Sequence, residues 1–81
     1  MDHLTTRELQ VLRLLAGGAS YQEIADSLVF TENAAHFHVS NILSKLHARN
    51  GTHAVAIAVT DGHISIRDLL SAVDEGKGRL L

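Results

Sequence analysis

The chain has 81 residues and no cysteine, which indicates a single domain with a modest core and excludes disulfides and thiolate metal sites. Its apolar fraction of 46% is too high for a disordered chain. Seven Lys and Arg side chains stand against nine Asp and Glu, so the sequence lacks the basic excess that is typical of proteins that bind nucleic acid.

Two short helices are predicted at the N-terminal end of the chain. Each begins with a capping box, in which a hydroxyl side chain at the N-cap pairs with a Glu three residues later. These pairs are Thr5 with Glu8 and Ser20 with Glu23. The first helix stops at Gly17–Gly18, because glycine accepts the backbone of a helix C-terminus. The second ends near Val29, before a tight turn at Phe30.

A third, longer helix is predicted from its N-cap Thr31 to about His47, with Glu32 in the first turn. Its apolar residues recur at helical spacing and form one stripe. The stripe consists of Ala35, Val39, Ile42, Leu43 and Leu46. The opposite arc, which is mostly polar, holds His36, Phe37, Ser40, Asn41 and Ser44.

Two more helices are predicted after the break at Asn50–Gly51. Thr52 is expected to cap a nearly all-apolar fourth helix, which ends at Asp61–Gly62. A fifth amphipathic helix is expected from the helical spacing of Ile66, Leu69, Leu70 and Val73. The chain therefore divides into a four-helix domain over residues 1–64 and an additional helix with a frayed tail over residues 65–81.

A short helix, a tight turn and a longer helix with an exposed polar face form a helix-turn-helix pattern. Further residues make the pattern specific. They are Leu4-Thr5-x-Arg7-Glu8-x-x-Val11-Leu12, Gly18-x-Ser20-Tyr21-x-Glu23-Ile24-Ala25-x-x-Leu28, His38, Ile42, Lys45-Leu46, Arg49-Asn50 and Thr52-x-Ala54-Val55. With these residues at fixed spacing, the segment 3–64 closely resembles the DNA-binding domain of the LuxR type.

This resemblance implies an all-α, four-helix domain that binds double-stranded DNA sequence-specifically in transcription regulation. The third helix would enter the major groove, and the fourth would join two domains into a homodimer on a two-fold DNA site. Domains of this type usually follow a receiver or ligand-sensing domain, so these 81 residues are either a fragment of a longer regulator or a regulator that stands alone.

The candidate site residues follow from the exposed arc and from the resemblance. For DNA binding they are Thr31, Asn33, His36, Phe37, His38, Ser40, Asn41, Ser44, Lys45 and Arg49. For dimerisation they are Thr52, Val55, Ala56 and Val59. Among the first set, His36 suits a purine acceptor, Asn41 suits adenine and Phe37 suits a thymine methyl group.

Departures from the family pattern leave a second function open. Ala34-Ala35-His36 stands where members of the family typically carry Thr-Val-Lys, and Gly51 stands where an arginine is common. We therefore expect either weak, salt-sensitive DNA binding or a target read by neutral donors and apolar contacts. The alternative is a helix-turn-helix scaffold that binds a protein partner through Phe37 and its last two helices, with weak or no DNA binding.

Several residues keep both a structural and a binding interpretation. Glu8 is expected to form an exposed pair with Lys45, which would orient helices more than stabilise them. His38 suits a structural hydrogen bond or a phosphate contact, and Arg49 suits the helix dipole or a phosphate. The fourth helix is covered by the fifth, pairs with a second copy, or does both.

The sequence favours neither an enzyme nor a metalloprotein. No nucleophile stands beside a base, no glycine-rich phosphate loop occurs, and no histidines are spaced four apart on a helix. The chain has no apolar run of membrane length and no signal-peptide pattern at its start. We therefore expect a cytoplasmic protein without a cofactor, a metal ion or membrane contact.

Overall fold

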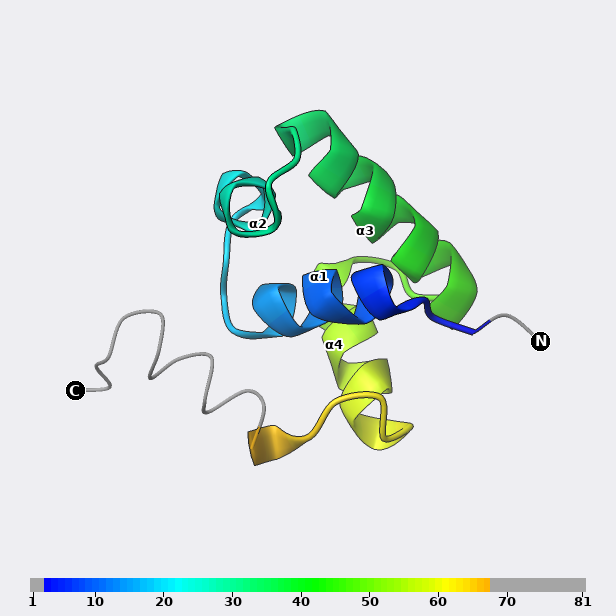
Figure 1. Cartoon of the computed structure of the whole chain (residues 1–81). Coiled ribbons are helices and arrows are strands. Elements are labelled where there is room, and N and C mark those ends of the chain that lie inside the picture. Colours follow the sequence, from blue (N-terminus) through cyan, green and yellow to red (C-terminus); the bar gives the residue numbers. More distant parts are fainter. Residues whose placement is uncertain (1–2, 68–81) are drawn as a thin grey trace.

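A computed structural model describes residues 3–67, which form a bundle of four helices without strands (Figure 1). The helices are α1 (Thr6–Ala16), α2 (Tyr21–Leu28), α3 (Glu32–Leu46) and α4 (Gly51–Thr60). The predicted all-α class with four helices in the first 64 residues is confirmed. The fifth helix predicted after Ser65 and the tail that follows lie almost entirely outside the described residues.

Local side-chain hydrogen bonds start the first two helices as predicted. The N–H of Glu8 donates to Thr5 Oγ1 at 3.0 Å, and the N–H of Thr5 donates to Glu8 Oε1 at 2.9 Å. Ser20 and Glu23 form the same reciprocal pair at 3.1 and 2.9 Å. Each box satisfies two backbone donors that the helix leaves without a partner, and losing such a cap typically costs about 1 kcal/mol.

Side-chain caps also begin the two later helices, and one of them differs from the prediction. The N–H of Ala34 donates to Thr31 Oγ1 at 3.0 Å, which confirms Thr31 as the N-cap of α3. The prediction of Thr52 as the N-cap of α4 is wrong, because that helix begins at Gly51 and its N-cap is Asn50. The backbone of Asn50 is extended, so its short side chain reaches back to accept from the N–H of His53 at 2.8 Å.

The core lies where α3 packs against each of the other three helices. Ten apolar side chains are buried there. They are Val11, Leu12, Ile24, Ala25, Ala35, Val39, Ile42, Ala54, Ala58 and Ile64. The small alanine side chains on α3 and α4 let the helix axes approach closely. Figure 1 shows α2 beside the first turns of α3 and α4 running from the other end of α3 past α1.

The turn between α2 and α3 contains an unusual backbone. Val29 caps α2 in the left-handed region, with φ 60° and ψ 53°, and its side chain is 89% exposed. A β-branched residue is strained in this region, because its Cβ crowds the carbonyl oxygen that follows. The N–H of Phe30 donates to the carbonyl of Ala25 at 2.9 Å, which closes the turn and directs the chain into α3.

Candidate nucleic-acid interface

One side of α3 is exposed to solvent along its whole length. His36, Phe37, Ser40 and Ser44 are exposed and Asn41 is half-buried, whereas the opposite stripe is in the core. Thr31 and Asn33 are exposed at the start of this side. Phe37 keeps 63% of its surface exposed, so packing against residues 3–67 does not explain this aromatic residue. The predicted division of the helix into a buried stripe and an exposed arc is confirmed.

His36 contacts one residue on α2 and one on α3. The ring of Tyr21 meets its imidazole edge-on, with centroids 4.0 Å apart. Glu32 lies one turn earlier on α3, and its Oε2 is 3.7 Å from His36 Nε2. The two side chains form an ion pair when the histidine is protonated. Neither neighbour was among the predicted site residues. The i, i+4 spacing of Glu32 and His36 signals their contact in the sequence, but no pattern there signals Tyr21.

His38 lies in a row of contacting side chains between the start of α1 and the exposed side of α3. Its ring is 5.1 Å from that of Phe30 and 5.8 Å from that of Phe37. The guanidinium group of Arg7 lies over the ring of Phe30, with its central carbon 5.7 Å from the ring centroid. These contacts give His38 a packing role, and its phosphate contact stays a prediction.

Lys45 is directed toward α1. Its Nζ donates to Glu8 Oε1 at 2.7 Å and to the carbonyl of His3 at 3.0 Å. Glu8 is only 4% exposed, so the expected exposed pair is in fact a largely buried one. Burial by itself raises the pKa of Glu8, but hydrogen bonds from Lys45 and Thr5 and the charge of Lys45 together lower that pKa below its usual value. With two of its three N–H donors engaged in this way, Lys45 links α3 to α1, and its DNA contact stays a prediction.

Arg49 is the other predicted basic contact, and it lies in the junction between α3 and α4. Its side chain is exposed, while its backbone N–H donates to Nδ1 of His53 at 3.0 Å. His53 in turn donates its own N–H to Asn50, so a short chain of hydrogen bonds fixes the backbone of the junction. The guanidinium is thus carried on an ordered backbone at the end of α3.

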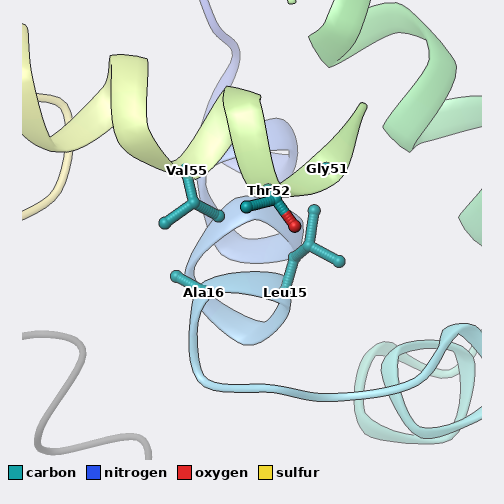
Figure 2. A pocket seen from close by; sticks show the side chains of 5 residues that line it. All are labelled: Leu15, Ala16, Gly51, Thr52 and Val55. Atoms are coloured by element: carbon teal, nitrogen blue, oxygen red, sulfur yellow. The ribbon is translucent and has the colours of Figure 1, made fainter. Parts of the chain in front are cut away.

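The predicted dimerisation residues lie on one helix, with differing exposure. Thr52 and Ala56 are exposed, while Val55 and Val59 are half-buried. Beside them is a hollow between the end of α1 and the start of α4, shown with its lining side chains in Figure 2. It is lined by Leu15, Ala16, Gly51, Thr52 and Val55, none of which carries a titratable group. The hollow therefore offers apolar contact and no acid–base chemistry.

Residues 3–67 contain neither a helix suited to span a membrane nor a cluster of metal ligands. No helix in this part of the chain is both long and apolar enough to cross a membrane. No three His, Asp or Glu side chains in this part come together as ligands for a metal ion.

Known proteins share this sequence pattern. The profile of bacterial regulatory proteins of the luxR family matches residues 2–58. The chain is 49% identical over 57 residues to the response regulator protein VraR of Staphylococcus aureus, and equally to that of Staphylococcus epidermidis. It is 38% identical over 64 residues to the transcriptional regulatory protein DegU of Brevibacillus brevis. These matches cover 70% and 79% of the chain but only 27% of each relative.

Proposed function

This chain belongs to the luxR family of bacterial regulatory proteins, and on that premise we propose that it binds double-stranded DNA as the DNA-binding domain of a transcription regulator. In this proposal α3 enters the major groove and its exposed side chains read base edges. Membership of a family of regulatory proteins supports the prediction that the chain is not an enzyme. Because it spans 27% of relatives named as response and transcriptional regulators, we also propose that a sensor or receiver domain controls it.

The observation that carries the proposal is the exposed side of α3 on a helix whose other side is fixed in the core. His36, Phe37 and Ser40 project from the first turns of this helix, and Ala35 and Val39 anchor those same turns. A helix-turn-helix protein reads base edges mainly with the N-terminal residues of its second helix. The geometry therefore presents one aromatic and several polar side chains where such contacts are made.

The charge distribution predicts a modest dependence on salt. Lys45 is engaged by Glu8, which leaves Arg49 as the basic side chain exposed near the end of α3. Each phosphate contact changes the logarithm of affinity by about 0.9 per logarithm of salt. One such contact per domain, and so two per dimer, would therefore weaken binding about tenfold between about 50 and about 200 mM salt. A strongly basic domain would lose far more.

We propose that α4 pairs two copies of the chain on a two-fold DNA site. Between Gly51 and Thr60 the sequence contains no Asp, Glu, Lys or Arg. The exposed residues of this helix are Thr52, His53, Ala56 and Thr60. A second copy doubles the number of phosphate contacts, which compensates for the few that one domain makes. The two half-sites would then be centred about 10 base pairs apart.

The test is a titration of the chain against random duplexes and against duplexes selected for binding, at about 50 and about 200 mM salt. His36→Ala and Phe37→Ala remove side chains from the exposed side of α3. Ile66→Ala is the matched control, because Ile66 is 63% exposed like Phe37 but lies after α4. We expect sequence-dependent binding that weakens with salt, is lost in the two α3 variants and is kept in the control.

An exposed Phe37 and a net charge of −2 favour a second candidate, a protein-interaction module built on the same scaffold. This candidate predicts no DNA binding at about 50 mM salt by a folded protein that associates tightly with itself or with a partner. Analytical ultracentrifugation of the same samples separates the two functions. Folded protein with no affinity for any duplex would rule out the DNA-binding proposal for this chain.

A further inference from the structure

Arg7 is an exposed cation in the first turn of α1. Within residues 3–67 its guanidinium makes neither an ion pair nor a hydrogen bond. The group lies over the ring of Phe30, with its central carbon 5.7 Å from the ring centroid. Attraction between a cation and a ring face engages no oxygen or nitrogen acceptor. The ring therefore holds the guanidinium in place while its N–H donors stay available to a ligand.

Two rings connect Arg7 to one edge of the exposed side of α3. The ring of Phe30 is 5.1 Å from that of His38, which is 5.8 Å from that of Phe37 on the exposed side itself. Successive residues of a helix are about 100° apart, so His36 and His38 lie about 200° apart and bound the exposed side at opposite edges. The His36 edge contacts α2. Arg7 therefore lies at the other edge, which faces the start of α1.

A second contact places the first turn of α1 beside that same edge. Lys45 lies about two turns after His38, so the two side chains share one edge of α3. Lys45 Nζ donates to Glu8 Oε1 at 2.7 Å, and Glu8 directly follows Arg7 in α1. The position of Arg7 relative to α3 thus follows from the packing of the two helices as well as from its own side chain.

A helix in the major groove has a phosphate backbone along each of its edges. The groove is about 12 Å wide and a helix with its side chains is about 10–12 Å across, so α3 would fill the groove. In a helix-turn-helix protein the first of the two helices, here α2, crosses one backbone. The other backbone then runs along the edge of α3 that carries His38. Arg7 lies at this edge with unengaged donors.

We propose that Arg7 contacts the DNA backbone: with α3 in the groove, its guanidinium donates a pair of hydrogen bonds to a phosphate on the side away from α2. This inference rests on the proposed function and deepens it, because it assigns a contact to α1, outside the helix-turn-helix. The planar fork of a guanidinium matches two phosphate oxygens. A phosphate contact carries no base information, so Arg7 sets affinity and not sequence preference.

The contact has a measurable size in the salt dependence of binding. Each neutralised phosphate contributes about 0.9 to the slope of log affinity against log salt. With Arg49 alone the slope is about 0.9 per domain and about 1.8 per dimer, and Arg7 doubles both values. Between about 50 and about 200 mM salt a dimer with both contacts weakens about 150-fold, compared with about tenfold for Arg49 alone.

The experiment measures the dissociation constant, Kd, of the full chain for a selected and a random duplex between about 50 and about 200 mM salt. Arg7→Gln should halve the salt slope and weaken binding to both duplexes by the same factor. Arg7→Lys keeps the charge and should keep the slope, with weaker binding because the fork is lost. Arg67→Gln removes an equal charge from an exposed residue after α4 and should change neither quantity.

A second neutral variant guards against an effect on folding. Arg7→Met keeps an apolar stem over Phe30 and should give the same slope as Arg7→Gln, with circular dichroism showing that both are folded. A wild-type slope in the folded neutral variants would overturn the inference and leave the proposed function standing. So would a changed ratio of Kd between the two duplexes, which would show that Arg7 reads a base. No binding of the folded wild type to any duplex at about 50 mM salt would overturn both.

Discussion

Replacing Lys45 by methionine removes the partner of a carboxylate that is 4% exposed. The 2.7 Å hydrogen bond from Nζ to Glu8 Oε1 is lost, as is the 3.0 Å bond to the carbonyl of His3. Breaking a fully buried pair costs about 3–5 kcal/mol, but here Lys45 is half-buried and Thr5 still donates to Glu8, so we expect a loss of about 1–3 kcal/mol. Methionine keeps the apolar stem, so packing changes little.

The measurement is urea unfolding followed by circular dichroism at neutral pH. It covers the wild type, Lys45→Met, Glu8→Gln and the double variant. Glutamine keeps an oxygen that accepts from Thr5, so Glu8→Gln tests the charge while the capping box remains. We expect a coupling energy of about 1–2 kcal/mol between the two sites. A coupling below about 0.5 kcal/mol would match an exposed surface pair and would refute the assignment of Lys45 as the anchor of α3 on α1.

The same pair predicts the direction of a pH effect. The pKa of Glu8 is lower in the folded chain than its ordinary value, so the ionised carboxylate stabilises the fold at neutral pH. That contribution is complete above the unfolded-state pKa of about 4.3 and is lost as pH falls below it, through the folded-state value. The free energy of unfolding should therefore fall less steeply on acidification in Glu8→Gln than in the wild type. If the free energy of unfolding fell equally steeply with pH in the two proteins, the ionised Glu8 carboxylate would not be the source of this stability.

Two more predictions concern stability. Val29→Gly should raise the free energy of unfolding by about 1 kcal/mol, because glycine has no Cβ to crowd the left-handed backbone of this exposed turn. Ser27→Gly, on the exposed side of α2, is its control and should lower stability by about 1 kcal/mol, and a loss in Val29→Gly as well would refute the strain. Asn50→Ala should cost about 1 kcal/mol in thermal unfolding by removing the cap on α4. Thr52→Ala should cost less than half of that, and the reverse order would show that Thr52 is the cap.

Local interactions made the helix starts and the exposed side of α3 predictable from the sequence. A capping box joins residues three apart, and an amphipathic stripe repeats every three or four, so both can be recognised without knowing the fold. For the same reason the i, i+4 contact between Glu32 and His36 was accessible to sequence reasoning. The motif residues around the two capping boxes also indicated the family that the matched profile confirms.

The tertiary structure decided what depends on how the helices meet. Glu8 and Lys45 are 37 residues apart, and only the packing of α3 on α1 shows that their pair is buried. Tyr21 reaches His36 because α2 packs beside the first turns of α3. The close approach of α1 to α4 is tertiary as well, since a Cβ on Gly51 would lie 3.3 Å from Leu15 Cδ2. Contacts of this kind join distant residues through the geometry of the core, which no local pattern encodes.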